Sequence, residues 1–345
     1  MVTCNLAFTT KSGDVYMFYP STVSLHMERT CTPATLTGTI PDVTGSPIEM
    51  GATCRFQVDG VTVFYGYVFQ RSVDRYGAVS FTAYDCTRYL KNPFSAFYKR
   101  GYQPKQVISD MAYRYGLKLG YIEDIPAIGR SLMIDNESCF DVISKLVETA
   151  SILNTKVYVF YAEDDKLNLR CAEDMITNAV IGENSLATDY TLSTSIDDDV
   201  YNEIALYRGS EHAGGRAYKT AKNAEDIAKW GHLVLMEASE DGMTTAQMQE
   251  KANRLLEMKD REFKSMNITA LGIVGLRAGM MITLHFPTLQ DPISKTQTVM
   301  IDSIDHTFED NVHTMSLEVR TFWRDSPSDK IEVKPFLPKG AWEDY

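Results

Sequence analysis

Alternating apolar and polar residues dominate the first 90 positions of the chain. The segments DVYMFYPSTVSLHMER and ATCRFQVDGVTVFYGYVFQRSVDRYGAVSFTAYD are rich in Val, Phe, Tyr and Thr, which favour half-buried strands. Asp59-Gly60 and Tyr76-Gly77 separate successive strand segments, and an Asp-Gly pair in such a place is a strong hairpin signal. The pattern predicts an antiparallel barrel or sandwich over residues 1–94.

A helical period replaces this alternation after residue 95. Pro104 lies near the start of the first predicted helix and Gly116 just past its end, the usual positions for these two residues. A second helix begins at Ser138, where Asp141 three residues later resembles a capping box. We therefore expect a compact helical region over residues 95–153.

The second half of the chain returns to strand patterns. TKVYVFYAEDDKLNLRCAE predicts a hairpin with Asp164-Asp165 at its tip, and residues 210–230 are polar, which indicates a long loop or a short helix. Thr244 and Gln247 have capping-box spacing at the start of a helix predicted over 244–263. We expect a second β-barrel-like domain over 154–323, interrupted by this helix. Residues 324–345 contain three prolines without any period, which is typical of an extension that becomes ordered on a partner.

Length and charge narrow the class of protein. A chain of 345 residues predicts two or three domains. Its net charge of −12 disfavours specific binding to a phosphate backbone. The six cysteines include no C-x-x-C pair, so we expect small buried hydrophobes in a reducing compartment. We find no signal-peptide pattern and no 18-residue apolar run, and we therefore expect synthesis in the cytoplasm without a membrane span.

The sequence offers no motif for catalysis, for a cofactor or for a metal. None of the six histidines has a zinc-ligand spacing, and the acidic runs 163–165 and 197–199 fit solvated turns better than a calcium loop or an acid pair. No G-x-S-x-G, P-loop or G-x-G-x-x-G occurs. Cys86 has no neighbour in sequence that would activate it as a nucleophile. We predict no catalytic, cofactor-binding or metal-binding residue.

One ordered series of short motifs resembles a known family. Strand residues Phe64, Gly66, Tyr67 and Val68 precede an A-Y-D-x-x-R-Y-L motif made by Ala83, Tyr84, Asp85, Arg88, Tyr89 and Leu90. QVISDMAYRYGL, SCFDVISKLVETA, VYNEIALYRG and the block with Leu271-Gly272 and Ala278-Gly279 follow in order. Over residues 60–320 this series is similar to the hub proteins of contractile phage tails and phage-tail-like bacteriocins, in the XkdQ-like branch of the late control gene D family.

The resemblance implies a mainly β fold with α insertions. It implies two tube-like antiparallel β-barrel domains and a small helical region per chain, and three chains would form a ring of six barrels. Such a homotrimer would join a sixfold tail tube to a threefold central spike, as a structural component of the baseplate. Its implied partners are the spike, the tail tube or tube initiator, the tape measure protein and other baseplate proteins.

The A-Y-D-x-x-R-Y-L motif suggests a corner between domains. Asp85 or Arg88 could hydrogen-bond exposed backbone at the strand end, while Tyr89 and Leu90 pack beneath it. Arg88 and Tyr89 are also candidate interface residues, since interfaces favour both residue types. In the C-terminal extension, Trp342 and Tyr345 are candidate anchors on a neighbouring subunit.

Two other functions stay open at this point. A peptidoglycan-hydrolysing tail enzyme could use two acidic residues far apart in sequence. A carbohydrate-binding β-module would need exposed aromatic residues on one face. Nineteen tyrosines allow this, although the three tryptophans, Trp230, Trp323 and Trp342, are dispersed.

Overall fold

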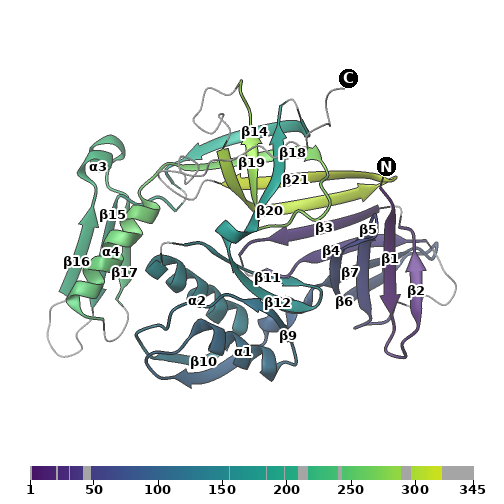
Figure 1. The fold of residues 1–345 in the computed structure, drawn as a ribbon, viewed down its shortest axis with the longest axis horizontal. Coiled ribbons are helices and arrows are strands. Elements are labelled where there is room, and N and C mark those ends of the chain that lie inside the picture. The colour runs from purple at the N-terminus through teal and green to yellow at the C-terminus, as the bar shows by residue number, and fades with distance from the viewer. Residues whose placement is uncertain are drawn as a thin grey trace.

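The computed structural model describes residues 2–20, 22–30, 32–41, 48–154, 156–183, 185–197, 199–208, 217–239, 243–288 and 297–320. One large sheet runs through this part of the chain, with a layer of helices and short strands on one side and a small unit at one end (Figure 1). The mainly β fold with inserted helices is therefore confirmed.

The large sheet contains 13 strands from both ends of the chain. Its order is β14-β18-β21-β20-β3-β4-β7-β6-β5-β1-β2, and β19 pairs with both β20 and β13. The first seven strands are β1 (Cys4–Thr9), β2 (Val15–Phe18), β3 (Thr22–Glu28), β4 (Thr35–Ile40), β5 (Thr53–Val58), β6 (Val61–Val73) and β7 (Val79–Tyr84). The others are β13 (Ile176–Gly182), β14 (Ala187–Ser195), β18 (Phe263–Leu271), β19 (Met281–His285), β20 (Gln297–Glu309) and β21 (Val312–Arg320).

The strand order contains an internal repeat. In space, β3-β4-β7-β6 has the same order as β14-β18-β21-β20, namely first, second, fourth and third along the chain. All neighbours within each set are antiparallel. β5 pairs with the first half of β6, and β19 pairs with the first half of β20. We call β3–β7 the first repeat, and β14 with β18–β21 the second repeat.

Both repeats bend within their longest strand, opposite the end of the strand that follows it in the chain. β6 and β20 are each 13 residues long. The register of β6 with β7 shifts between Val68 and Gln70, and that of β20 with β21 shifts between Ile301 and Ser303. Such a bulge bends a strand and increases its twist. The first half of each strand can then follow β5 or β19 into a second layer, while the other half stays in the main layer.

A single hydrophobic core lies between these layers and includes both repeats. Phe8 of β1 packs edge-on against Phe81 of β7, with ring centroids 5.1 Å apart. Phe56 of the first repeat packs against Phe308 of the second at 5.0 Å. Both rings of this second pair are buried, so the core holds the two repeats together as well as each repeat in itself.

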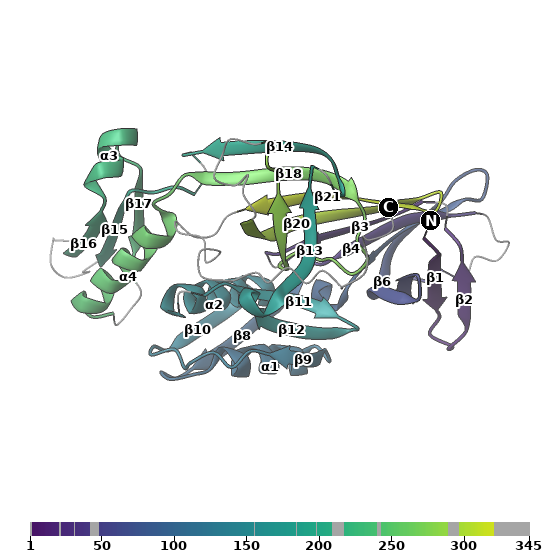
Figure 2. The same ribbon diagram turned by 45° about the horizontal axis from the view of Figure 1, so that its top comes forward.

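The chain between the repeats forms a middle layer with its own core, which lies against the large sheet (Figure 2). Two helices pack on a three-stranded sheet, β11-β12-β9, and a two-stranded sheet, β10-β8. The elements are η1 (Cys86–Lys91), β8 (Pro93–Tyr98), α1 (Pro104–Arg114), β9 (Lys118–Ile122), β10 (Leu132–Ser138), α2 (Cys139–Asn154), β11 (Tyr158–Glu163), β12 (Lys166–Cys171) and η2 (Ala172–Met175).

A peripheral unit is inserted between β14 and β18 of the second repeat. It contains β15 (Glu203–Arg208), β16 (Ala217–Lys222), α3 (Ala224–Trp230), β17 (Val234–Ala238) and α4 (Thr245–Lys259). The strands form a separate sheet in the order β16-β15-β17, and α4 covers one face of it. None of the helices described here or above is both long and apolar enough to cross a membrane.

The local predictions for helices are largely confirmed. Pro104 occupies the first turn of α1, and Ser138 accepts a hydrogen bond from the Asp141 N–H at the start of α2. Thr244 and Gln247 form the predicted capping box of α4. The prediction for the end of α4 is wrong, because the helix stops at Lys259 and β18 already begins at Phe263. Asp260 ends the helix there, and its carboxylate accepts a hydrogen bond from Asn223.

The two closed barrels are not confirmed. Within the described residues the large sheet is open, with β14, β2 and β13 as its outermost strands and no pairing among these three. The physical reason is that the edges of the two repeats pair with each other, β20 with β3, instead of closing each repeat on itself. The domain boundaries at residues 94, 153 and 323 stay a prediction.

The shared core gives a first test of this fold. We expect Phe308→Ala to lower the free energy of unfolding by about 3–5 kcal/mol, because it removes a buried ring that contacts the opposite repeat. Chemical denaturation followed by circular dichroism measures this change. Phe97→Ala is the matched control, since this ring is 61% exposed on β8. Equal losses in the two variants would contradict a core shared by the repeats.

Candidate functional site: the joint between the repeats and its corner

The joint is the antiparallel pair β3–β20, which runs in register from Thr22 opposite Glu309 to Glu28 opposite Ser303. Alternate residues on the core side are buried, including Leu25 and Phe308. On the opposite side, His26 Nδ1 lies 2.7 Å from Asp305, and His26 Nε2 lies 3.2 Å from Glu28. Partial burial opposes protonation of His26, but these two carboxylates outweigh it and raise the pKa of its imidazole.

The face of the sheet away from the core is polar across both repeats, and we call it the polar face. One cross-strand row consists of Thr314, Thr307, Ser24, Thr37 and Thr82, each opposite the next in register. Glu28, Asp305, Glu309 and Glu318 add carboxylates to the same face. The alternation that buries one side of each strand therefore produces a hydroxyl-rich, acidic surface that extends over both repeats.

Asp85 holds the corner where the first repeat leads into the middle layer. One carboxylate oxygen accepts hydrogen bonds from the Thr87 N–H and hydroxyl, and the other accepts from the Ala34 N–H at 3.2 Å. Burial raises the pKa of Asp85 to about 6, although these hydrogen bonds favour the ionised form. Leu90 is fully buried in the core of the middle layer. Asp85 thus hydrogen-bonds backbone beside a strand end, as the motif suggests, while a corner between domains stays a prediction.

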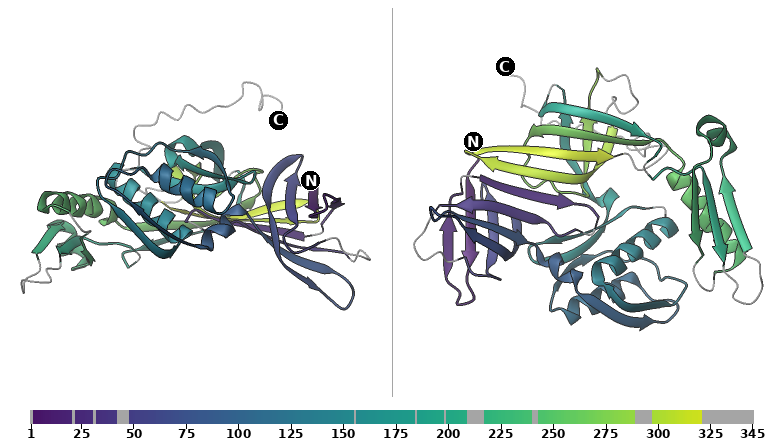
Figure 3. Two further views of the ribbon diagram at one scale, coloured as in Figure 1. Left: turned by 90° about the horizontal axis from the view of Figure 1, so that it is seen from below. Right: turned by 180° about the vertical axis from the view of Figure 1, so that it is seen from behind.

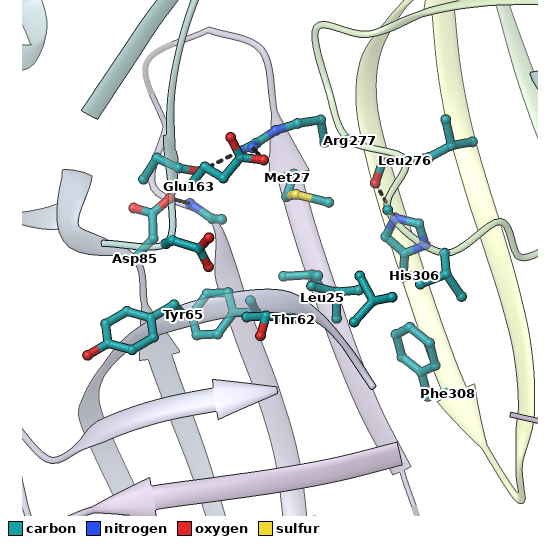
Figure 4. A pocket seen from close by; sticks show the side chains of 18 of the residues that line it. Leu25, Met27, Thr62, Tyr65, Asp85, Glu163, Leu276, Arg277, His306 and Phe308 are labelled. Atoms are coloured by element: carbon teal, nitrogen blue, oxygen red, sulfur yellow. Dashed lines mark hydrogen bonds and ion pairs between the residues drawn. The ribbon is translucent and has the colours of Figure 1, made fainter. Parts of the chain in front are cut away.

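A cavity of about 180 Å³ lies beside this corner, between the joint and the tip of the β11–β12 hairpin (Figure 4). Arg277, from the loop between β18 and β19, donates a hydrogen bond to the Ala162 carbonyl at 2.7 Å and stacks over the Tyr161 ring at 3.9 Å. Its guanidinium also lies 4.0 Å from Glu163. Arg277 thus links the second repeat to the middle layer.

Two glycines allow the loop that carries Arg277 to approach its neighbours closely. A Cβ atom on Gly279 would lie 2.3 Å from the Val159 side chain, and one on Gly272 would lie 2.1 Å from the His313 ring. Gly279 also has φ +88°, a conformation that other residues rarely adopt. The glycine-rich loop lies between two strands, as the sequence indicates.

Two buried histidines, neither predicted as a site, meet next to the cavity. His306 Nε2 donates to the Leu276 carbonyl at 3.0 Å, and His306 Nδ1 lies 2.9 Å from His313 Nε2. Because Nδ1 of neutral His306 can then only accept, His313 carries its proton on Nε2. His313 Nδ1 is buried without a hydrogen-bond partner among the described residues. Burial, with the neighbouring His313 as a second cause, lowers the pKa of His306 to about 4, and burial lowers that of His313 to about 4.

The cavity is a poor match for an active site that cleaves a polymer. Its volume of about 180 Å³ is below the range of roughly 300–1,000 Å³ that is usual for ligand sites. Both oxygens of Asp85 already accept hydrogen bonds from the protein. Within the described residues, no group of three or more His, Cys, Asp and Glu side chains could hold a metal ion. The residues around the cavity connect the first repeat, the middle layer and the second repeat.

The structure places two of the predicted interface residues beside an unpaired strand edge. The Arg88 guanidinium lies 5.3 Å from the Phe69 ring centre, and the Tyr89 ring packs against Tyr67 and Phe69 at 5.6 and 5.7 Å. Phe69 begins the second half of β6, which pairs with β7 on one side and with no described strand on the other. Trp342 and Tyr345 lie outside the described residues.

Comparisons of the fold define the class of protein. The tail protein from Neisseria meningitidis MC58 matches with a TM-score of 0.70 at 12% identity, over 93% of this chain and 98% of that one. The E. coli c3393 protein, described as a type VI secretion component with structural similarity to the T4 bacteriophage tail proteins gp27 and gp5, matches with a TM-score of 0.53 at 10% identity. This match covers 88% of this chain and 74% of that one. The fold is that of structural proteins of phage tails and baseplates.

Sequence comparison defines the family. The family model described as YQBQ-like matches residues 23–320, so the chain belongs to the YQBQ-like family. The phage-like element PBSX protein XkdQ of Bacillus subtilis is 28% identical over 319 residues, which cover 90% of this chain and 95% of that protein. The resemblance to phage baseplate hub proteins that the sequence motifs indicate is confirmed.

The corner carboxylate gives a second prediction. We expect Asp85→Asn to lower the free energy of unfolding by about 1–3 kcal/mol, because the amide nitrogen would face a backbone or hydroxyl donor. Urea denaturation at pH 7 measures the loss, and Asp135→Asn, on an exposed position of β10, is the control. A loss no larger than that of the control would mean that the Ala34 and Thr87 contacts do not stabilise the corner.

The histidine pair gives a third prediction, on pH. The pKa of each imidazole is lower in the folded than in the unfolded chain, so their contribution to stability is complete above about pH 6.5 and is lost as the pH falls toward 4. Asp85 acts in the opposite direction, because its pKa is raised. Relative to His306→Gln/His313→Gln, the native chain should lose on the order of 6 kcal/mol more between pH 7 and pH 4, about 3 kcal/mol for each imidazole.

Denaturation midpoints at several pH values measure this difference, to which Asp85 contributes equally in both proteins. His232→Gln, at a side chain that is 64% exposed, is the control and should keep the native profile. Parallel profiles for the native chain and the double variant would show that the buried pair does not titrate as its burial requires.

Proposed function

We propose that the chain is the baseplate hub of a contractile tail or injection machine. Three copies form a ring that joins a sixfold tail tube to a threefold central spike. The observation that carries this proposal is the internal repeat, whose two members are joined by the β3–β20 pair inside one chain. The same kind of strand pairing, formed between neighbouring chains, closes the ring.

The unpaired edges support this mode of assembly. The second half of β6 corresponds to the half of β20 that pairs with β3, and β14 corresponds to β3. One chain therefore carries both members of a second joint, unpaired within the described residues. A head-to-tail contact of this kind generates a ring when its rotation closes. Three chains bring six repeats around the axis, which fits a sixfold tube.

The repeat also predicts the register of the joint between chains. Gln70 opposite Thr82 corresponds to Ser303 opposite Glu318, so Ser72 corresponds to Asp305. On the other edge, Thr191 opposite Asn267 corresponds to Ser24 opposite Thr37, so Ser193 corresponds to His26. Asp305 pairs with His26 inside the chain. Ser72 of one copy should therefore lie opposite Ser193 of the next.

The polar face lines the lumen of this ring. Its hydroxyl and carboxylate side chains, Glu28, Asp305, Glu309 and Glu318 among them, repel a polyanion such as DNA and let it pass without binding. Arg88 and Tyr89, packed against Phe69 beside the unpaired half of β6, contribute to the subunit contact. This role explains their position at the end of the first repeat.

The partners follow from this position in a particle. The fold shared with c3393 supports a spike protein below the ring, and the six repeats present a surface for a tail tube or tube initiator above it. A tape measure protein in the lumen and other baseplate proteins around the rim complete the set. The role is structural rather than enzymatic, in keeping with the fold shared with the tail protein from Neisseria meningitidis MC58, and the place of action is the assembled baseplate.

A pair of cysteine substitutions tests the ring and its register. Opposed residues in antiparallel strands have Cα atoms about 4.5–5.5 Å apart, within the range that a disulfide spans. We expect Ser72→Cys/Ser193→Cys to give a disulfide-linked species of three chains under oxidising conditions, alone or after co-expression with a spike protein. Native mass spectrometry should show three times the 38.8 kDa chain.

The control is Ser72→Cys/Thr220→Cys, which moves one cysteine to the peripheral unit and should not cross-link. A trimer without the disulfide would refute the register but keep the ring. A monomer both for the chain alone and after co-expression with a spike protein, together with release of soluble fragments from purified cell walls, would refute the hub and favour a hydrolase.

A further inference from the structure

One face of the sheet in the peripheral unit carries exposed apolar side chains, and Glu203, Thr220 and Lys222 are the polar residues that share this face in the register. Ile204 and Leu206 of β15 face α4 and lie in the core of the unit. The alternate side chains face the other way: Tyr218 of β16 and Val234 and Met236 of β17, which are 48%, 44% and 56% exposed. The rear view shows these strands with α4 behind them (Figure 3). We call this surface the outer face of the peripheral unit.

The composition of the outer face differs from that of the polar face. Tyr207 and Tyr218 lie side by side on it with ring centroids 6.3 Å apart. In the next row of the register, Ala205 lies between Thr220 and Met236. The strands at both edges of this small sheet, β16 and β17, have no second neighbour among the described strands. A face with exposed apolar side chains and open edges is the kind of surface to which an extended segment can bind.

The chain leaves the large sheet at the base of this unit. β21 ends at Arg320, which pairs with Ser265 of β18 and stacks over the Phe263 ring at 5.6 Å. Phe263 is the first residue of β18 after the peripheral unit. The 25 residues from 321 to 345 therefore begin beside the base of the unit, and an extended chain of that length spans roughly 80 Å, several times the length of a five-residue strand.

The sequence of this extension contains one segment that matches the outer face. Residues 330–334, Lys-Ile-Glu-Val-Lys, alternate so that Ile331 and Val333 share one side. Pro335 follows, and then Phe336 and Leu337. Nine residues, 321–329, separate Arg320 from this segment, roughly 30 Å of extended chain, which is enough to reach the face from its base.

We propose that residues 330–337 bind to the outer face of the peripheral unit of their own chain, with Ile331 and Val333 covering Met236 and Val234. The side chains that this segment buries are apolar, and its Lys and Glu side chains stay in water. The C-terminal extension is thereby held on the unit inserted in the second repeat, and Trp342 and Tyr345 are presented next to it. The inference does not depend on the ring.

Oxidation of individual methionines by hydrogen peroxide tests this contact in the full-length chain, because the rate of sulfoxide formation follows exposure. Met236 should react several-fold more slowly in the native chain than in the variant Ile331→Asp/Val333→Asp. Met133, which is 69% exposed on β10 of the middle layer, is an internal standard and should react equally fast in both proteins. Peptide mass spectrometry measures both rates.

Glu332→Gln is the matched control, because residue 332 lies on the opposite side of the segment, and it should keep Met236 protected. Protection must also persist on hundredfold dilution if the segment belongs to the same chain. Protection that is lost on dilution would assign the segment to another copy and overturn the proposal. Equal reactivity of Met236 and Met133 in the native chain would overturn it as well.

Discussion

The pairing of β3 with β20 is the constraint on which the structure depends. These strands are separated by most of the chain, yet their hydrogen bonds turn two similar five-strand units into one sheet. The pairing places Phe56 against Phe308 in a shared core and aligns the polar rows of both units on the opposite face. It also fixes which edges remain: β14 and the second half of β6 have no further partner among the described strands. Packing within either unit alone would not specify that β3 pairs with β20.

Much of the local structure could be read from the sequence because its causes are local. Pro104, Ser138 and the Thr244–Gln247 capping box fix helix starts through contacts within one turn. The Asp59-Gly60 turn, with both residues at positive φ, joins β5 to β6 as its composition indicates. The strand β16 was missed because Ala217–Lys222 is polar, and only its pairing with β15 makes it a strand. The repeat could not be recognised either, since it lies in the order of strands and not in matching residues.

The site was only partly predictable, for a related reason. Asp85 stands out in its motif, and its bond to Ala34 follows from its place at a strand end. His306, His313 and Arg277 carry no signal, because each acquires its role from a partner that is distant in sequence: another strand for the histidines, and a hairpin of the middle layer for Arg277. Arg277 lies between Gly275 and Gly279, and this spacing alone indicates no partner. Contacts of this kind are fixed by topology, which the periodicity of a sequence does not encode.

The insertion of the peripheral unit has a consequence for how such chains diversify. Ser195 and Phe263, where the chain leaves and re-enters the large sheet, lie opposite each other in the β14–β18 ladder. A segment whose two ends are already adjacent adds little strain to its host, since closing a longer loop costs only slightly more entropy. This hairpin is therefore a graft point: a foreign domain with neighbouring termini could replace the unit there while the strands on either side keep their register. An engineered particle could display a binding domain or a reporter at that position.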